Sequence, residues 1–332
     1  MTTPRTVLIT GGTGFVCMNI AEALLTRGSS VVLLARHAPP AALLREFDAL
    51  PGRLTFACGD VTNAASLAAA IRQHHITDFI HGAAVTPSQE AEYQDPVSIM
   101  QINCMGVLNA LEAARQTGVG RFLYLGSVSG YGRTCFTSDV LIEGESLGDP
   151  HTLYELSKFT GERLVQRYRA LFGMDAALLR VGDVFGPWER RTGVRSFMSV
   201  PYQLTTAALR GEPPVLPGPN RIDWVYGRDI GASAAALLHA PTLDYDAYPL
   251  CSGFLWPITD WCRRLAARFP SFSWSMAAPG EAPTIRVNQT QDNAPMQADR
   301  LVRQTGYRPH YDLDLAFDDY MRWLDAHPAW LA

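Results

Sequence analysis

Residues 6–17, TVLITGGTGFVC, decide the fold of this chain. The first five form an apolar run typical of a buried strand, the glycines predict a tight turn, and a helical pattern follows. This succession is typical of a turn that holds the pyrophosphate of a dinucleotide at a helix N-terminus. Gly11 would permit the turn, and Gly14 the close approach of the backbone to the pyrophosphate. Cys17 replaces the third glycine of the pattern, and we expect it to shift the helix slightly outward without abolishing binding.

Strand and helix patterns alternate along the chain as far as residue 181. The predicted strands are 6–10, 30–35, 54–58, 78–81, 121–125 and 176–181, and the predicted helices are 20–27, 64–74, 97–116 and 151–171. This alternation predicts an α/β fold with a doubly wound parallel Rossmann sheet. A further strand and helix at 221–238 would return to the sheet.

The composition of the sequence changes after residues 186–187, where proline, glycine and tryptophan become more frequent. We therefore assign residues 1–182, with a returning segment at about 221–254, to an NAD(P)-binding Rossmann domain. Residues 183–220 and 255–332 would form a smaller C-terminal substrate-binding lobe.

The composition is that of a globular protein. It combines 47% hydrophobic residues with a formal charge of −4, which excludes a disordered chain and argues against a nucleic-acid partner. The six cysteines form no C-x-x-C pair and the histidines show no metal-binding spacing, so we expect reduced cysteines and no metal site. No apolar run approaches the roughly 20 residues of a membrane span, and the N-terminus shows no signal-peptide pattern. We therefore expect a cytoplasmic protein without a membrane partner.

The end of the second predicted strand indicates which cofactor the turn would hold. An acidic residue there would bind the 2′-hydroxyl of NAD, but the sequence has Ala35 and Arg36. A guanidinium beside the 2′ position favours NADP over NAD, unless Arg36 simply faces solvent. Asp60 and Val61, which close the third strand, would lie at the adenine edge, unless Asp60 only caps a helix or turn.

Tyr154 and Lys158 lie four residues apart on a predicted helix, which puts a phenol and an ammonium group on one face. A phenol needs a nearby cation to work as an acid/base near neutral pH. Ser127 follows the fifth strand, at the carboxyl end of the sheet, where ligands bind in this architecture. Taken singly, the pair can arise by chance and the serine can be a loop cap.

Together these residues resemble the extended short-chain dehydrogenase/reductase family, of the NAD-dependent epimerase/dehydratase type. The motifs that carry the resemblance are TGGTGFV at 10–16, GDVT at 59–62, HGAA at 81–84, the helix start at 103–106, GSVSGYG at 126–132, Y-x-x-x-K at 154–158, RVGDVFGPWE at 180–189, DWVYGRD at 223–229 and GYRP at 306–309. The resemblance covers almost the whole chain, and the order of its motifs makes it specific.

The resemblance implies a role for each candidate residue. Tyr154 would be the general acid/base at the substrate oxygen, and Ser127 would hydrogen-bond the same oxygen. Lys158 would favour the ionised tyrosine and hold the nicotinamide ribose, and Asn103 would lie on a helix that supports a proton relay. The residues implied to line the cofactor are Gly11, Thr13, Gly14, Phe15, Val16, Arg36, Asp60, Val61, Ala83, Ala84, Tyr154 and Lys158.

Many members of this family act on nucleotide sugars and hold the diphosphate with arginines of the smaller lobe. At the first such position the chain has Ile222 with Arg221 one residue away, so a shift of one residue in register would restore an arginine. Near the second position, the stretch 288–299 offers Asn288, Gln289 and Gln291 and no arginine. Asp183 stands where an asparagine often lies near the sugar nucleotide, and its charge would oppose a diphosphate.

The residues predicted to line the substrate cleft are Thr86, Pro87, Ser129, Trp188, Phe197, Met198 and Trp224. They are mostly apolar or aromatic, which suits a small uncharged or aromatic alcohol or ketone. The tryptophans and Met198 have the core of the lobe as their alternative place. An anionic substrate would instead be bound by Arg190, Arg191 and Arg195, which otherwise form a solvated basic loop.

These observations favour an NAD(P)-dependent oxidoreductase that interconverts a secondary alcohol and a ketone on a small, non-nucleotide substrate. The alternative is a nucleotide-sugar epimerase or dehydratase, which uses its cofactor transiently. The complete set of Ser127, Tyr154 and Lys158 argues against a cofactor-binding module without catalysis. We also expect a homodimer through helices 97–117 and 151–171, because their apolar stripes exceed what one sheet face covers and relatives pack them as a four-helix bundle.

Overall fold

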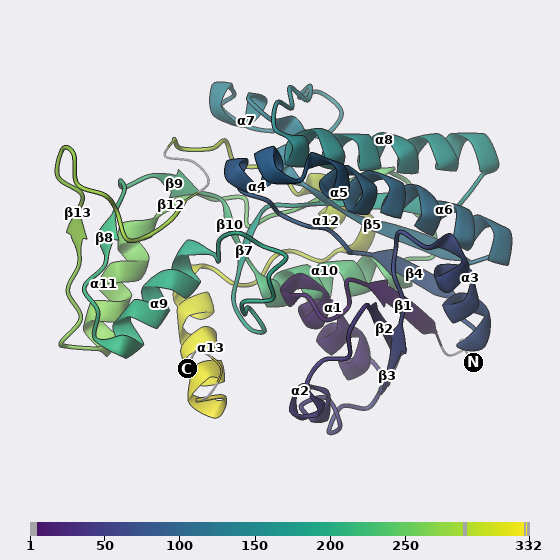
Figure 1. Ribbon diagram of the computed structural model, residues 1–332, viewed down its shortest axis with the longest axis horizontal. Helices are drawn as coiled ribbons and strands as arrows, with labels where there is room; N and C mark the ends of the chain where they lie inside the picture. The colour runs from purple at the N-terminus through teal and green to yellow at the C-terminus, as the bar shows by residue number, and fades with distance from the viewer. Residues whose placement is uncertain (1–4, 288–290, 329, 331–332) are drawn as a thin grey trace.

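The computed structural model describes residues 5–287, 291–328 and 330. Its centre is a seven-stranded sheet in the order β11-β6-β5-β4-β1-β2-β3, and every neighbouring pair is parallel. The strands are β1 (Thr6–Thr10), β2 (Ser30–Ala35), β3 (Arg53–Cys58), β4 (Asp78–His81), β5 (Arg121–Ser127), β6 (Ala176–Val181) and β11 (Ala247–Leu250). Helices cover both faces of this sheet (Figure 1), which confirms the predicted doubly wound α/β fold.

The side chains of the strands alternate between two apolar cores, one on each face of the sheet. Val7 and Ile9 of β1 belong to one core, and Leu8 between them belongs to the other. The first core is covered by α1 (Phe15–Thr26) and α10 (Gly227–His239), and the second by α3 (Ala64–Gln73), α6 (Gly106–Thr117) and α8 (Leu153–Phe172). Since parallel strands are buried on both faces, they appear as continuous apolar runs, and this is why the sequence reveals them.

The helix predicted over 97–116 is irregular. It begins as α5 (Pro96–Met100), passes through a wider π-helical turn (Gln101–Met105) and continues as α6. The first helix, α1, also differs from the prediction, because it begins directly after the glycine turn rather than at residue 20.

The prediction that a strand at the start of 221–238 returns to the main sheet is wrong. That strand, β10 (Trp224–Tyr226), pairs with β7 (Asp183–Phe185) in a separate two-stranded sheet, and only α10 packs on the main sheet. The seventh strand is β11, which pairs with β6 at the edge of the sheet. It contains Pro249, which has no N–H to donate, and an edge strand is where such a residue is tolerated. The proline therefore concealed the strand in the sequence.

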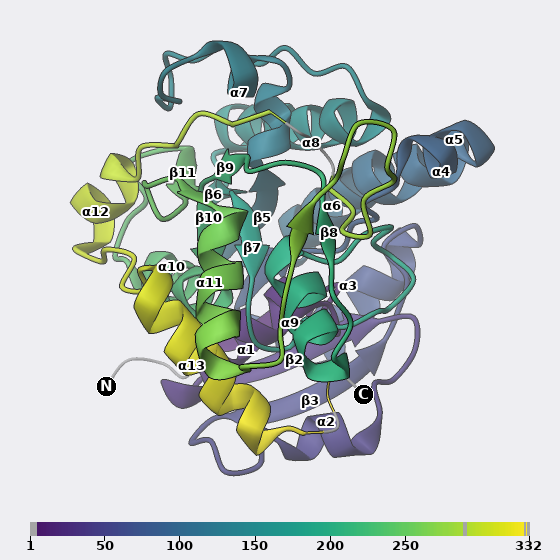
Figure 2. The same ribbon diagram turned by 90° about the vertical axis from the view of Figure 1, so that its left-hand side faces the viewer.

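The other elements lie mainly on the left of Figure 1, and this side faces the viewer in Figure 2. They include α9 (Val200–Arg210), β8 (Val215–Leu216), β9 (Arg221–Ile222), β12 (Trp256–Pro257), α11 (Ile258–Arg268), β13 (Ser275–Met276) and α13 (Leu313–Ala326). Four short elements are α2 (Ala41–Arg45), α4 (Gln89–Gln94), a 3-10 turn (Val128–Tyr131) and α7 (Thr134–Thr137). The helix α12 (Asp299–Thr305) packs against β11 and α10. None of the helices in the described part of the chain has the length and apolar content needed to cross a bilayer.

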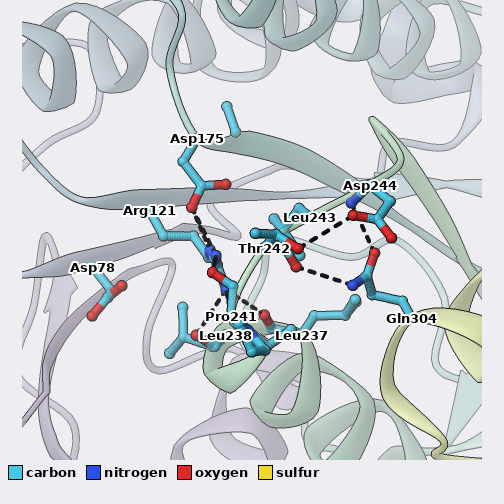
Figure 3. A network of polar contacts seen from close by, with 12 residues as sticks. Asp78, Arg121, Asp175, Leu237, Leu238, Pro241, Thr242, Leu243, Asp244 and Gln304 are labelled. Atoms are coloured by element: carbon cyan, nitrogen blue, oxygen red, sulfur yellow. Dashed lines mark hydrogen bonds and ion pairs between the residues drawn. The ribbon is translucent and has the colours of Figure 1, made fainter. Parts of the chain in front are cut away.

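A buried arginine fastens the end of α10 to the start of β5 (Figure 3). Arg121 begins β5 and is ion-paired with Asp175 at 2.7 Å. Its Nη1 donates to the carbonyl oxygens of Leu237, at 2.9 Å, and Ala240, at 2.6 Å, where α10 ends. A cation is favourable at this end because the last carbonyl groups of a helix have no partner within it.

Candidate functional site

The glycine turn between β1 and α1 has the shape of an anion-binding site. Gly11 has a φ of 64°, and a Cβ there would lie 2.7 Å from the Cα of Ala83 in the loop after β4. Gly14 precedes α1, and neither a side-chain cap nor an acidic residue occupies the first turn of that helix. The N–H groups at this helix end and the positive end of the helix dipole are therefore free for an anion. Among the predicted cofactor residues here, Thr13, Val16, Ala83 and Ala84 are half-buried and Phe15 is buried in the core.

Cys17 fits beside the turn because the residue opposite it is a glycine. Its Sγ lies 3.6 Å from the carbonyl oxygen of Thr10, and a Cβ added to Gly82 would lie only 2.4 Å from this sulfur. Burial raises the pKa of the Cys17 thiol to about 12, so the thiol stays protonated and unreactive. The space that accommodates the sulfur is thus provided by the loop after β4.

The residues predicted to bind the adenosine part of the cofactor have different surroundings. Arg36 directly follows β2 and is exposed, which is compatible with a 2′-phosphate contact and with the alternative that it faces solvent. Asp60 accepts hydrogen bonds from the backbone N–H and the hydroxyl of Thr62, both at 2.8 Å, through the same oxygen Oδ1. Val61 is buried at 7% exposure. Asp60 therefore caps a turn, as its alternative interpretation held, and keeps its second oxygen for a ligand.

Tyr154, Lys158 and Ser127 lie at the carboxyl end of the sheet. Tyr154 and Lys158 are in the first two turns of α8, which begins with a capping box formed by Thr152 and Glu155. Lys158 is buried, and its Nζ donates to the carbonyl oxygen of Leu125 at 2.9 Å. The same Nζ lies 5.9 Å from the centre of the Tyr154 ring. Ser127 is the last residue of β5, in register with Val181 of β6.

Asn103 connects two parts of the site. It lies in the π-helical turn, 1% exposed, and its Oδ1 accepts from the backbone N–H of Val85 at 2.9 Å. Its Nδ2 donates to the carbonyl oxygen of Val85 and to the hydroxyl of Ser157, both at 3.0 Å. Asn103 thereby fastens the loop after β4 to α8, and its place in a proton relay stays a prediction.

Sequence reasoning missed one acidic residue beside α8, the helix that carries Tyr154 and Lys158. Glu92 of α4 accepts a hydrogen bond from the backbone N–H of Tyr154 at 3.1 Å. A carboxylate is favourable at a helix N-terminus, so Glu92 helps to hold the start of α8. No local pattern links the two residues, because they are 62 positions apart.

Three of the residues predicted to line the cleft belong to the core instead. Trp188, Met198 and Trp224 are 3%, 6% and 4% exposed. Trp188 stacks on Phe47, with ring centres 4.9 Å apart, and its Nε1 donates to Glu22 at 2.7 Å. Their alternative place was therefore the correct one, because packing against distant aromatic side chains buries them.

The other predicted cleft residues lie on loops that meet. Thr86 and Arg195 form an isolated parallel bridge, in which the N–H of Thr86 donates to the carbonyl oxygen of Val194 at 2.8 Å. The N–H of Ser196 donates back to the carbonyl oxygen of Thr86 at 3.1 Å. Pro87, Ser129 and Phe197 are half-buried. The loop after β4 is thus joined to the loop that follows β7.

At the positions where the family resemblance implies diphosphate-binding arginines, the described residues include no arginine without an ion pair. Ile222 is buried at 3% exposure, whereas Arg221 is exposed and ion-paired with Asp292 at 2.9 Å. Asn288 and Gln289 lie outside the described residues, and Gln291 is exposed. The register at this position, with Ile222 or Arg221 in place of the first arginine, stays a prediction.

Asp183 places an acidic group in the lobe. Its Oδ2 accepts a hydrogen bond from Nδ2 of Asn293 at 3.3 Å. Burial, reinforced by the neighbouring charge of Asp223, raises the pKa of Asp183 to about 6, although Arg195 opposes the shift. Asp223 itself accepts hydrogen bonds from the hydroxyl of Ser252 at 2.6 Å and from the backbone N–H of Met296 at 3.2 Å.

The three arginines of the loop after β7 have different surroundings. Arg191 is exposed, and Arg195 is ion-paired with the buried Glu189 at 3.1 Å. Arg190 reaches the glycine turn, where its Nη2 donates to the carbonyl oxygen of Thr13 at 2.7 Å. Within the described residues, no group of three or more histidine, cysteine or acidic side chains is placed to hold a metal ion.

Comparison with known proteins gives consistent matches. A family model described as "NAD dependent epimerase/dehydratase family" matches residues 7–248. UDP-glucuronate 4-epimerase 1 of Arabidopsis thaliana is 29% identical over 223 residues, which are 65% of this chain and 50% of that protein. The 3-beta-hydroxysteroid dehydrogenase of Mycolicibacterium neoaurum is 30% identical over 198 residues, 54% of this chain and 48% of that one. The matches to these two relatives thus span only about half of their length.

Solved structures resemble the fold over nearly the whole chain. The epimerase Mth375 from Methanothermobacter thermautotrophicus has a TM-score of 0.83 at 22% identity, covering 99% of this chain and 94% of that one. MoeE5 in complex with UDP-glucuronic acid and NAD has a TM-score of 0.79 at 19% identity, covering 97% and 99%. The TM-scores establish that the folds are alike, and at identities this low the comparison extends to the fold alone.

Proposed function

Because this chain belongs to the NAD-dependent epimerase/dehydratase family, we propose that it is an enzyme that oxidises a secondary alcohol of its substrate with a bound nicotinamide dinucleotide. The observation that carries the proposal is that Tyr154, Lys158 and Ser127 lie at the carboxyl end of the sheet, where the glycine turn also lies. The turn fits a dinucleotide, since Gly11 has no room for a Cβ and the first turn of α1 has no side-chain cap. When bound, the nicotinamide supplies the hydride acceptor.

Three side chains, those of Tyr154, Ser127 and Lys158, have separate roles in the transfer of the substrate's hydroxyl proton. Tyr154 takes the hydroxyl proton of the substrate, and Ser127 hydrogen-bonds the oxygen on which charge changes during the reaction. Lys158 uses one of its three N–H donors on Leu125 and keeps two for the tyrosine oxygen and a ribose hydroxyl. The bond to the Leu125 carbonyl holds the cation in place, so no reorganisation is needed at the moment of reaction.

A nucleotide-linked sugar is the substrate class that the relatives support best. They include UDP-glucuronate and UDP-glucose 4-epimerases, and the structural neighbours include complexes with UDP-sugars. This similarity favours epimerisation or dehydration, in which the hydride returns to the substrate, over the small non-nucleotide ketone expected from the sequence. Because UDP-glucuronate 4-epimerase 1 is matched over only 50% of its length, the substrate is part of the proposal.

One observation favours the second candidate, a net alcohol/ketone oxidoreductase. The lobe has a carboxyl group at Asp183, which weakens the attraction for a diphosphate, and an isoleucine at 222, which supplies no positive charge to offset it. One relative, at 30% identity, is a 3-beta-hydroxysteroid dehydrogenase. The exposed Arg36 supports NADP as the cofactor, whereas several structural neighbours were solved with NAD.

Product analysis tests these candidates. The purified protein is incubated with NAD⁺ or NADP⁺ and with UDP-glucose, UDP-galactose or UDP-glucuronic acid. NMR detects an epimer or a dehydrated sugar, and absorbance at 340 nm detects free reduced cofactor. A sugar product without net reduction supports the first candidate, and stoichiometric reduction with a simple secondary alcohol supports the second. A protein that binds neither dinucleotide would overturn both, and Tyr154→Phe serves as the inactive control.

A further inference from the structure

Arg190 is a half-buried cation with a fully buried Nη1, and no carboxylate of the described residues balances its charge. Its Nη2 donates to the carbonyl oxygen of Thr13 at 2.7 Å, but its Nη1 is buried and has no hydrogen-bond partner among the described residues. Within the same part of the chain no carboxylate is ion-paired with it. Two arginines near it in the chain or in the site do have such partners: Arg195 is paired with Glu189, and Arg180 with Glu162.

Such an arrangement is costly unless an anion completes it. A guanidinium removed from water loses hydration that only hydrogen bonds and an opposite charge can replace. One neutral carbonyl oxygen satisfies one of its five N–H donors. The face of Trp330, 5.7 Å away, adds a weaker attraction for the cation but accepts no conventional hydrogen bond.

The position of the unpaired group indicates which anion is missing. Thr13 is part of the glycine turn, so Arg190 contacts the same segment whose backbone leads into α1. Gly14 leaves the helix without a side-chain cap, and no acidic side chain offsets the positive helix end. Two positive groups, one from the helix dipole and one from the loop after β7, therefore converge on one place.

We propose that Arg190 is the counter-ion of a diphosphate bound at this turn, and that this diphosphate is the pyrophosphate of the dinucleotide cofactor. The inference rests on the proposed function, because it needs a dinucleotide at the turn. The substrate diphosphate is the less suitable source, since the guanidinium contacts the turn itself while a carboxyl group, Asp183, lies in the lobe.

This assignment gives the loop after β7 a role in holding the cofactor. Trp330, whose ring faces Arg190, also donates from Nε1 to the carbonyl oxygen of Glu189 at 2.7 Å. Trp330 thus contacts both the loop and the guanidinium, and the guanidinium in turn contacts the glycine turn at Thr13. A bound pyrophosphate would join the two segments through a pair of charge-assisted hydrogen bonds.

Calorimetric titration with ADP-ribose, which carries the pyrophosphate but no nicotinamide, tests the inference. Arg190→Gln should weaken ADP-ribose binding about ten- to a hundredfold, the effect expected from hydrogen bonds to a charged group. Adenosine, which has no phosphate, should bind the wild type and this variant equally. Arg191→Gln removes the exposed neighbouring charge and should leave ADP-ribose affinity within about twofold of the wild type. Arg190→Lys keeps a cation without the planar fork and should give an intermediate affinity.

A titration with UDP on the protein saturated with ADP-ribose separates the two sources of diphosphate. Equal UDP affinity in the wild type and Arg190→Lys supports the cofactor, and a loss confined to UDP would refute the assignment. Unchanged ADP-ribose affinity in both Arg190 variants would also refute it, while leaving the proposed function intact. A wild type that binds neither ADP-ribose nor NAD(P)H would instead refute the proposed function. Should Arg190→Gln fail to fold, the comparison of Arg190→Lys with Arg191→Gln decides the question, and full ADP-ribose affinity in the former counts against the inference.

Discussion

The contact between Cys17 and Gly82 allows the cost of one added methyl group to be worked out. In Gly82→Ala the new Cβ would lie 2.4 Å from the Cys17 sulfur and 2.9 Å from Cδ1 of Leu125. The leucine methyl is the end of a flexible side chain and can move away, but the sulfur is held between α1 and the carbonyl oxygen of Thr10. Overpacking of this kind costs about 1–3 kcal/mol. We therefore expect Gly82→Ala to destabilise the protein by about 2 kcal/mol.

A double-mutant cycle isolates the part of this cost that is due to the sulfur. Cys17→Ala removes only the sulfur and should cost about 1 kcal/mol by itself, because it leaves a small cavity. In the double variant the methyl group added at position 82 occupies that cavity, so the two changes together should cost less than their sum by about 1–2 kcal/mol. Thermal unfolding followed by circular dichroism measures the four proteins, and about 1 kcal/mol corresponds to a few degrees in Tm.

The control for this cycle is Gly218→Ala, since a Cβ at this glycine would meet nothing within 4 Å. Its effect should be small and should add simply to that of Cys17→Ala. Additivity of Gly82→Ala and Cys17→Ala within about 0.5 kcal/mol would refute the reasoning, because contacting residues must show coupling if their contact is the cause.

Four further outcomes are expected. Tyr154→Phe should lower turnover about 10²- to 10⁴-fold while the Kd for the cofactor stays the same, and a variant that keeps half of the wild-type rate would exclude its acid/base role. Arg36→Ala should lower kcat/KM with NADPH about ten- to a hundredfold and leave that with NADH unchanged, and a wild type that prefers NADH would contradict the assignment. Because the pKa of Asp183 is raised to about 6 from an ordinary 3.8, its ionisation in the folded state costs stability as the pH rises from about 4 to 6. Asp183→Asn should therefore raise the free energy of unfolding at pH 8 by at most about 3 kcal/mol, seen as a higher Tm than that of the wild type. This gain should vanish below pH 4, and a difference in Tm that is independent of pH would count against the reasoning. Val97 and Met105 are 63% and 49% exposed on the helices expected to form a dimer, so Val97→Glu with Met105→Glu should give a monomer in light scattering, and a monomeric wild type at micromolar concentration would reject the dimer.

Local patterns were sufficient for the first six strands, the glycine turn and the placing of the proposed catalytic pair on one helix. Strands buried on both faces must be apolar throughout, and β2 and β4 consequently have the bounds that the sequence predicted. Gly11 lies against the backbone of Ala83 with no room for a Cβ, so this position of the turn requires a glycine, which can be recognised in the sequence. Tyr154 and Lys158 share one helix, and their spacing alone places them together.

The tertiary structure alone decided which side chains face the core and which charges are balanced. Trp188 resembles a cleft residue in the sequence, but Phe47, from a distant part of the chain, stacks on it and buries it. Arg190 and Arg191 are neighbours in the chain, yet one contacts the turn at Thr13 and the other is exposed. The edge strand β11 was concealed by a proline, a residue that an edge position tolerates. Burial and charge balance depend on tertiary contacts between segments that are distant in the sequence. Short-range periodicity carries no information about those contacts.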